Sequence, residues 1–330
     1  MKNFTSVNDI GDPSSLINEA IELKKNPWAH SHLGKNKTLG LIFLNPSLRT
    51  RLSSQKAAQL LGMNALIMNM DKEGWALEWS DGAVMNTNKT EHIKDAAMVL
   101  STYCDIIGIR CFPTLTDREA DYSEHAIKQL IKYSTVPVVS LESATLHPMQ
   151  SLADCISIKE KWHKKTKPKV VLTWAPHVKA LPQAVANSFS EWMQKSDVDF
   201  VITHPKGYEL APQFTKGITV EYEQEKALQG ADFVYVKNWS AYEPYGQTPA
   251  VEKDWLLSEQ KMKVTNDAYI MHCLPVRRNV ELPDKLLDGK RSLIALQAEN
   301  RLFSAAAVLK QILETTSKKA NGHQLLANSL

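Results

Sequence analysis

Short apolar runs alternate with longer segments of helical period along the whole 330-residue chain. This alternation limits the fold more than any other feature, because buried parallel strands read as continuous apolar runs and need helical crossovers between them. We therefore predict the α/β class, with two doubly wound parallel sheets joined by long helices. The predicted strands span residues 39–44, 65–70, 105–110, 136–141, 169–174, 199–204, 232–239 and 268–275.

The chain is longer than one hydrophobic core usually organises, so we expect two domains with the active site in the cleft between them. A predicted helix over residues 147–162 joins the domains, and its first turn tolerates Pro148 because no helical hydrogen bond is lost there. We place the boundary near Gln150, which gives a first domain of residues 1–150 and a second of residues 151–300. The other predicted helices span residues 51–62, 92–104, 123–134, 184–195 and about 301–317.

Composition and spacing exclude several classes of function. Apolar residues make up 43% of the chain, and no apolar run approaches the roughly 18 residues of a membrane span. The N-terminus lacks an apolar signal segment, so we expect a cytoplasmic protein without membrane contact. A formal charge of +3 without a basic stripe argues against nucleic-acid binding. The four cysteines lack CxxC spacing and no HxxxH or HExxH pair occurs, so we expect no disulfide framework, no metal and no cofactor.

The segment FLNPSLRTR, residues 43–51, is the strongest local signal for function. It lies where a predicted strand ends and an amphipathic helix begins. Ser47 and Thr50 can cap this helix, and Arg49 and Arg51 add positive charge at its start. A phosphate group there would meet backbone N–H, hydroxyl and guanidinium donors together. An ordinary capped helix with solvated arginines has the same pattern, and the chain contains neither GxGxxG nor a P-loop.

Three further segments end predicted strands at the same edge of a sheet, where open parallel sheets bind their ligands. Arg110 ends one strand, and His147 and Gln150 lie one turn apart at the start of the joining helix. The run from His272 to Pro275 closes the last predicted strand, and Arg277 and Arg278 follow it directly. Each segment also has an ordinary structural explanation: a surface ion pair for Arg110, a helix cap for His147 and a buried packing role for His272.

Taken together, SLRT after a strand, HPMQ opening a helix and HCLP followed by arginine resemble the motif set of the aspartate and ornithine transcarbamylases. The resemblance runs from about residue 36 to residue 312. It implies transfer of a carbamoyl group from carbamoyl phosphate to an amine, without metal or cofactor, in arginine biosynthesis. Residues 1–150 would form the carbamoyl phosphate-binding domain, residues 151–300 the acylornithine-binding domain, and residues 301–330 a C-terminal helix that returns to the first domain.

The resemblance also implies roles for individual residues. Carbamoyl transfer places negative charge on the carbonyl oxygen, which the counterparts of Thr50, Arg110 and His147 polarise. Gln150 and the backbone at Cys273 and Leu274 match positions that hold the carbamoyl amide, and Gln150 and Cys273 complete the predicted catalytic set. The predicted carbamoyl phosphate contacts are Ser47, Leu48, Arg49, Thr50, Trp75, Arg110, His147, Pro148, Met149, Gln150, Cys273, Leu274 and Arg301.

The second half of the chain resembles transcarbamylases that act on N-acylated ornithine. The Ser-Met-Gly loop that binds free ornithine is missing, since VKNWSAYEPYGQ stands at residues 236–247. The acetyl-specific enzymes have glutamate at the position of Thr90 and lysine at the position of Ala306, whereas the succinyl-specific ones have proline and no lysine. Thr90 matches neither, but a small neutral residue suits the longer succinyl chain, so we favour N-succinyl-L-ornithine and keep N-acetyl-L-ornithine as the alternative. The predicted acylornithine contacts are Glu142, His177, Lys237 and Arg278.

Trp75 lies in a polar loop, residues 71–82, where an aromatic side chain is usually a local packing anchor. In the family this loop reaches the active site of a neighbouring subunit. The resemblance therefore implies a homotrimer in which Trp75 contacts carbamoyl phosphate in trans. Two other functions fit two α/β domains: a nicotinamide-dependent dehydrogenase, which lacks support because the glycine fingerprint is absent, and a non-catalytic phosphate-ligand binding protein.

Overall fold

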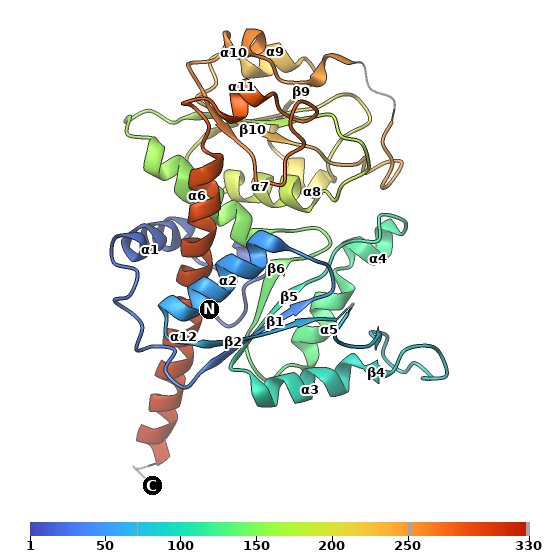
Figure 1. Ribbon diagram of the computed structural model, residues 1–330, viewed down its shortest axis with the longest axis vertical. Helices are drawn as coiled ribbons and strands as arrows, with labels where there is room; N and C mark the ends of the chain where they lie inside the picture. Colours follow the sequence, from blue (N-terminus) through green and yellow to red (C-terminus); the bar gives the residue numbers. More distant parts are fainter. Residues whose placement is uncertain (71, 250–252, 328–330) are drawn as a thin grey trace. The chain divides into compact units, whose positions relative to one another are not determined.

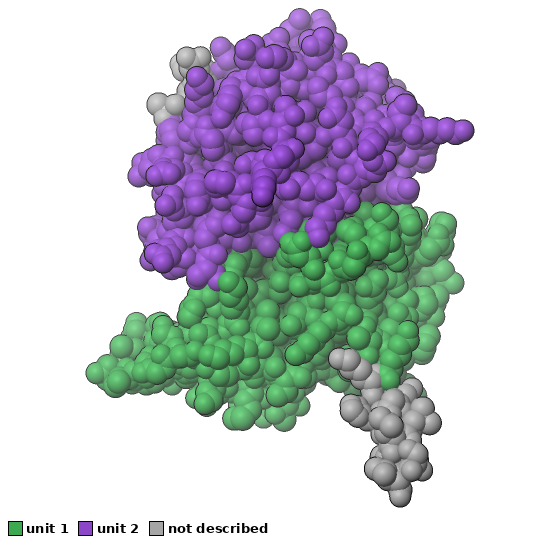
Figure 2. All heavy atoms as spheres, turned by 180° about the vertical axis from the view of Figure 1, so that it is seen from behind, with its two compact units in different colours: residues 1–112, 124–143, 301–330 green, residues 113–123, 144–300 purple. Residues whose placement is uncertain are grey.

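The computed structural model describes every residue of the chain except 71, 250–252 and 328–330 (Figure 1). The chain forms two compact units (Figure 2). Unit 1 comprises residues 1–112, 124–143 and 301–330, and unit 2 comprises residues 113–123 and 144–300. Each unit has its own parallel sheet, which confirms the predicted α/β fold. None of the helices in the described ranges combines the length and hydropathy of a membrane-spanning segment.

The sheet of unit 1 has the order β2-β1-β5-β6, and all its strands run parallel. The chain moves from β1 to β2 on one side and then returns to place β5 on the other side of β1. Helices α3 and α5 cover one face of the sheet, and α2 lies on the other (Figure 1). The strands are β1 (Thr38–Phe43), β2 (Asn64–Asn69), β5 (Ile106–Arg110) and β6 (Val138–Glu142), beside a separate short pair, β3 (Leu77–Glu78) and β4 (Glu91–His92). The helices are η1 (Val7–Asp9), α1 (Pro13–Lys25), α2 (Leu48–Leu60), α3 (Ile93–Tyr103), α5 (His125–Tyr133) and most of α12 (Ile294–Ala327).

The sheet of unit 2 has the order β11-β10-β7-β8-β9 and is also parallel. Here the strand order reverses between β7 and β10. The strands are β7 (Lys169–Trp174), β8 (Asp199–Thr203), β9 (Thr219–Glu221), β10 (Phe233–Lys237) and β11 (Tyr269–Met271). The helices are α4 (Arg118–Tyr122), α6 (Pro148–Lys161), α7 (Ala184–Gln194), α8 (Pro212–Thr215), α9 (Gln224–Leu228), η2 (Lys253–Trp255), α10 (Glu259–Met262) and α11 (Asp284–Leu287).

Reversal of strand order fixes where each sheet can bind a ligand. The helices that follow two neighbouring strands then diverge to opposite faces, which opens a crevice at the carboxyl ends of those strands. In unit 1 this point lies between β1 and β5, at Phe43 and Arg110. In unit 2 it lies between β7 and β10, at Trp174 and Lys237.

A continuous apolar core supports each sheet. In unit 1, Ile107 and Ile109 of β5 are at most 1% exposed and pack with Leu130 of α5. In unit 2, Val171 and Val234 are fully buried and belong to one cluster with residues of α9. Each such side chain contributes about 1.5–3 kcal/mol to folding, so the cores hold the strand ends at the two crevices in fixed positions.

The ends of the predicted strands lie within four residues of the observed ones, and strands β3, β4 and β9 were not predicted. The predicted start of the last helix near residue 301 is wrong. Helix α12 begins at Ile294 because Gln297 and Asn300 lie one turn apart and both bury their amides in hydrogen bonds to α6. These polar residues therefore continue a buried helix face instead of ending it. Helix α1 was not predicted, although Asp12 caps it and Pro13 occupies its first turn.

Candidate active site

The predicted phosphate-binding segment forms the junction between β1 and α2. Ser47 caps α2, and its hydroxyl accepts the N–H of Thr50 at 3.4 Å. Thr50 is 2% exposed, whereas Leu48 is 67% exposed and Arg49 is intermediate. The N-terminus of α2 therefore lies at the strand-order reversal of unit 1, where its N–H groups and helix dipole favour an anion.

The hydroxyl of Thr50 joins two arginines that are distant in the sequence. Arg301 Nη2 donates to it at 3.0 Å, and Arg110 Nη1 lies at the outer limit of a hydrogen bond, 3.5 Å away. Both arginines are buried, at 4% and 7% exposure. The structure thus gathers three predicted site residues around the first turn of α2.

Glu142 balances the charge of Arg110. Arg110 Nη1 donates a hydrogen bond to Glu142 Oε2, and both side chains are buried. The pairing depends on a shift in strand register beside Arg110, which brings it opposite Glu142 at the end of β6. The ring of Phe112 lies 4.3 Å from the guanidinium carbon of Arg110. Glu142, a predicted acylornithine contact, therefore lies in unit 1 and contacts Arg110, a predicted catalytic residue.

The HPMQ motif opens α6 in unit 2. The carbonyl of His147 accepts the N–H groups of Gln150 and Ser151, at 3.1 and 3.2 Å, and Pro148 occupies the first helical position. His147 and Gln150 are 4% and 1% exposed. Gln150 Nε2 donates to the carboxylate of Asp154, one turn further along α6, at 2.8 Å.

The HCLP motif follows β11 and is held by its own histidine. Leu274 has a left-handed backbone, φ 56°, and its N–H donates to His272 Nδ1 at 2.9 Å. This places the ring proton on Nε2, which lies 3.6 Å from Glu281 Oε1. Burial opposes ionisation of Glu281, but the bond to His272 and the charge of Lys237 outweigh it and lower the pKa of Glu281. The Glu281 carboxylate and the His272 ring thus lie together behind the Cys273 segment.

His177 and Lys237 lie near the strand-order reversal of unit 2. Lys237 ends β10 and is 7% exposed, and His177 follows β7 by three residues. Two bonds lock these strand ends together: Asn238 Nδ2 to the carbonyl of Ala175 at 2.7 Å, and Trp174 Nε1 to a neighbouring carbonyl at 2.9 Å. Residues after β7 and β10 are therefore held close to one another.

The two arginines after HCLP differ in their surroundings. Arg277 Nε donates to His177 Nε2 at 3.2 Å. Arg278 is about half exposed and bonds to Asp288 and Asp284 at 2.7–2.8 Å, contacts that raise its pKa. The structure therefore joins Arg277 to a predicted acylornithine residue and holds Arg278, which the sequence analysis selected, in a surface ion-pair cluster.

Trp75 and Thr90 lie in one exposed loop around the β3–β4 pair. Trp75 is 54% exposed and donates its indole N–H to Glu91 at 2.7 Å. The N–H of Thr90 donates to the carbonyl of Ala76, next to Trp75, at 3.0 Å. The position that differs between acetyl and succinyl enzymes therefore lies beside the tryptophan predicted to act in trans.

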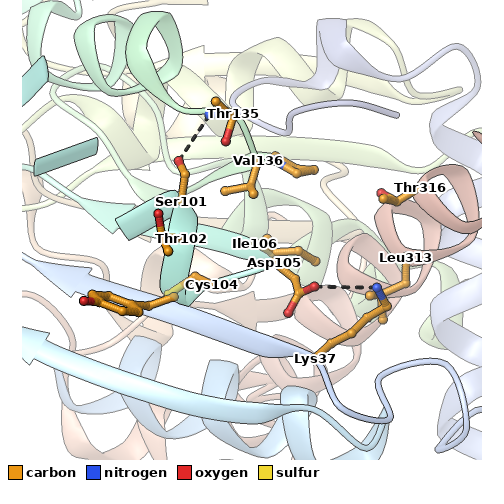
Figure 3. A pocket seen from close by; sticks show the side chains of 12 residues that line it. Lys37, Ser101, Thr102, Cys104, Asp105, Ile106, Thr135, Val136, Leu313 and Thr316 are labelled. Carbon is orange, nitrogen blue, oxygen red and sulfur yellow. Dashed lines mark hydrogen bonds and ion pairs between the residues drawn. The ribbon is translucent and has the colours of Figure 1, made fainter. Parts of the chain in front are cut away.

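A cavity of about 290 Å³ opens elsewhere in unit 1, at the amino ends of the strands (Figure 3). Lys37 precedes β1 and Asp105 precedes β5, and their charged atoms lie 3.6 Å apart across this cavity. Thr316 of α12 completes the lining on one side. Because Arg110 ends its strand at the opposite edge of the sheet, this cavity is not the predicted phosphate site.

Sequence reasoning missed several polar residues behind the predicted site. Asp154 carried a usable signal, since an acidic residue four positions after Gln150 shares its helix face. Gln297 carried none, because its partners Asp154 and His272 are far away in the chain. Within the described ranges, no group of three or more potential metal ligands comes together.

Comparisons with known proteins indicate the same family as the sequence motifs. Residues 2–160 match the model of the aspartate/ornithine carbamoyltransferase carbamoyl-P binding domain, and residues 182–312 match that of the Asp/Orn binding domain. The N-succinylornithine carbamoyltransferase of Bacteroides thetaiotaomicron is 52% identical over 316 residues, 95% of this chain and 99% of that protein. The N-acetylornithine carbamoyltransferase of Xanthomonas axonopodis pv. citri is 33% identical over 331 residues, 94% and 96% respectively. A solved variant of an N-acetyl-L-ornithine transcarbamylase, complexed with carbamyl phosphate and N-succinyl-L-norvaline, superposes with a TM-score of 0.89 at 32% identity over 94% of this chain and 100% of that one.

Proposed function

Because this chain belongs to the aspartate/ornithine carbamoyltransferase family, we propose that it carbamoylates the side-chain amine of N-succinyl-L-ornithine. Carbamoyl phosphate is the donor, and the products are N-succinyl-L-citrulline and phosphate, a step in arginine biosynthesis. Relatives named for the succinyl substrate share 51–52% identity with this chain, against 33% for those named for the acetyl substrate. This difference favours the succinyl acceptor.

The contact of Arg301 and Arg110 with the hydroxyl of Thr50 is the observation that carries the proposal. Two buried guanidinium groups, one of them paired with Glu142, lie at a helix N-terminus, where a phosphate dianion can accept several hydrogen bonds. The same groups stabilise the dianion as it leaves. A preorganised donor of this kind lowers a barrier by about 3–4 kcal/mol.

The chemistry then needs no group beyond the two substrates and these donors. The lone pair of the uncharged acceptor amine forms a bond to the carbonyl carbon, and negative charge develops on the carbonyl oxygen. Arg110, His147 and Thr50 would stabilise that charge. The carbon–oxygen bond to phosphate then breaks, and the departing phosphate takes the proton that the amine loses. Gln150 and the backbone at Cys273 would hold the carbamoyl NH₂ group during this step.

Acyl preference is proposed to depend on Thr90 and Ala306. Thr90 is small and uncharged and lies in the loop that carries Trp75, so it adds no carboxylate that would repel a succinyl group. Ala306 is 1% exposed and brings no cation into the core of unit 1. Thr90 therefore suits an anionic acyl chain by its lack of negative charge, and Ala306 supports the succinyl substrate because the succinyl enzymes lack a lysine there.

A colorimetric citrulline assay tests the proposal directly. Carbamoyl phosphate is supplied with N-succinyl-L-ornithine, N-acetyl-L-ornithine or L-ornithine, and we expect the largest kcat/KM with the succinyl substrate. Higher activity with the acetyl substrate would establish the alternative acceptor. Binding of carbamoyl phosphate without product from any acceptor would support the alternative of a non-catalytic phosphate-ligand binding protein.

Replacement of Thr90 tests the origin of the acyl preference. Thr90→Glu should lower succinyl activity relative to acetyl activity at least tenfold, through repulsion between two carboxylates at close range. Thr90→Val has a similar volume without charge and serves as the control. An equal effect of both substitutions would show that charge at this position does not set the preference.

We also propose a homotrimer in which the Trp75 loop serves a neighbouring subunit. Leu48 and Leu52 are exposed one turn apart on α2, which packs beside β2, and Leu66 and Met68 are exposed on that edge strand. An apolar patch along an edge strand marks a protein interface. The cytoplasmic location expected from the N-terminal sequence stays a prediction.

Subunit mixing tests the shared site. Trp75→Ala and Arg110→Ala should each abolish most activity in pure form. If the loop acts in trans, refolding the two variants together restores activity, because some sites then receive both intact residues. A trimeric mass by light scattering with no recovery on mixing would confine Trp75 to its own subunit.

A further inference from the structure

A fully buried carboxylate on α6 connects two of the predicted substrate-binding motifs. Asp154 is 0% exposed, and its Oδ1 accepts hydrogen bonds from Gln150 Nε2 and Gln297 Nε2, both at 2.8 Å. Tyr235 lies beside it, and burial and then the negative charge of Asp154 raise the pKa of that phenol well above its usual value. Burying a charged carboxylate costs free energy unless the carboxylate is hydrogen-bonded. The geometry of the hydrogen bonds to Asp154 is therefore informative.

The carboxylate determines which way both amides face. An ionised carboxylate only accepts hydrogen bonds, so each glutamine must turn its NH₂ group towards Asp154 and its carbonyl oxygen away. Gln297 shows the consequence, since its Oε1 accepts the N–H of His272 at 2.9 Å. His272 in turn accepts the N–H of Leu274 through Nδ1.

One chain of hydrogen bonds therefore runs from Gln150 through Asp154, Gln297 and His272 to Leu274, all within unit 2. Donor and acceptor roles alternate without conflict along its length. If Asp154 donated at either bond, the amide it contacts would have to turn over.

We propose that Asp154 is a positioning residue that fixes hydrogen-bond polarity at the carbamoyl end of the site. It turns the carbonyl oxygen of Gln150 outward and, through Gln297 and His272, holds the backbone around Cys273 and Leu274. The NH₂ group of carbamoyl phosphate is a pure donor and needs such oxygen acceptors. This inference rests on the proposed function, because it assigns Asp154 to recognition of the carbamoyl NH₂ group.

Asp154→Leu is the decisive substitution because it keeps a branched side chain of similar length and removes both carboxylate oxygens. Both glutamines donate to Oδ1 of Asp154, so an asparagine could still accept both bonds, whereas leucine accepts neither. Both amides then lose their acceptor at position 154, and Gln150 can turn over. If Gln150 turns, its own NH₂ group faces the carbamoyl NH₂ group, and attraction between them becomes repulsion.

The test compares three phosphate probes by isothermal titration calorimetry: carbamoyl phosphate, acetyl phosphate and inorganic phosphate. Acetyl phosphate has a methyl group in place of NH₂, and inorganic phosphate has neither. We expect Asp154→Leu to reduce the preference for carbamoyl over acetyl phosphate about tenfold. Affinity for inorganic phosphate should change less than twofold, since the predicted phosphate donors lie in unit 1.

Ser157→Ala is the matched control. Ser157 is also fully buried on α6, and its hydroxyl accepts a hydrogen bond from Asn300 of α12 at 3.0 Å. Its loss removes a similar bond between the same two helices and leaves Gln150 untouched. We expect a lower melting temperature and an unchanged preference among the three probes.

Gln297→Met gives a second route if Asp154→Leu does not fold. It removes one donor to Asp154 and the acceptor of His272 N–H, and we expect a smaller loss of the same preference. The inference is overturned if a folded Asp154 or Gln297 variant keeps the wild-type preference, or if affinity for inorganic phosphate falls equally. A wild-type protein without preference for carbamoyl phosphate would instead overturn the proposed function.

Discussion

Neutralising Glu142 should destabilise the protein and identify which substrate this residue serves. Glu142 and Arg110 are 6% and 7% exposed and share a hydrogen bond, so Glu142→Gln leaves a buried guanidinium beside a neutral amide. Breaking a buried ion pair costs about 3–5 kcal/mol. We expect the lower end, about 3 kcal/mol, because the amide oxygen of glutamine can still accept the bond. That loss corresponds to a melting temperature about 6–12 °C lower.

A ligand that brings negative charge to Arg110 should reverse part of this loss. A phosphate dianion replaces the missing carboxylate, so saturating inorganic phosphate should raise the melting temperature of Glu142→Gln more than that of the wild type. Differential scanning calorimetry with and without phosphate measures both effects. Glu221→Gln is the control, since Glu221 pairs with the largely exposed Lys226 at 3.0 Å and its loss costs at most about 1 kcal/mol.

Kinetics of the same variant separate the two possible roles of Glu142. If it acts through Arg110, the KM for carbamoyl phosphate rises and kcat falls. If it contacts the acceptor, as the family resemblance implies, the KM for N-succinyl-L-ornithine rises instead. A melting temperature within 2 °C of the wild type, together with unchanged kinetic constants, would refute the argument from the buried pair.

Three further outcomes follow from single contacts. Tyr245→Phe removes the phenol that donates to buried Asp121 at 2.8 Å and should cost about 1–2 kcal/mol in urea unfolding; a change below 0.3 kcal/mol would contradict this. The lowered pKa of Glu281 means that its ionisation adds stability above its unfolded pKa near 4.5, and this is lost as pH falls through the folded value. Glu281→Gln should therefore flatten the acid limb of a stability–pH profile, and an identical limb would disprove it. Gly40→Ala places a methyl group 2.6 Å from Cys104 Sγ and should destabilise by about 1–3 kcal/mol, measured by thermal melting; an unchanged melting temperature would show that the strand shifts freely.

Local pattern was sufficient to predict most strands of the two sheets and the residues that follow them. Apolar runs located the strands, and the residues that directly follow them are fixed at the carboxyl edge by the polypeptide itself. Ser47 caps α2 four residues after β1 ends, and Gln150 lies in the first turn of α6 because Pro148 begins that helix. Such positions depend on residues nearby in the sequence, so they can be predicted without the tertiary structure.

Tertiary structure alone decided which side chains meet. Thr50 and Arg301 are 251 positions apart, and Asp154 and Gln297 are 143 apart. The residue pattern within a single helix or strand therefore predicts neither contact. Whether Arg110 carries a solvated charge or a balanced one depends on the register between β5 and β6, which sets Glu142 opposite it. The amino-acid sequence by itself determined the class of fold and the family of reaction. The charge balance and the hydrogen-bond polarity of the site came only from packing, because both depend on distant groups that share a low-dielectric interior.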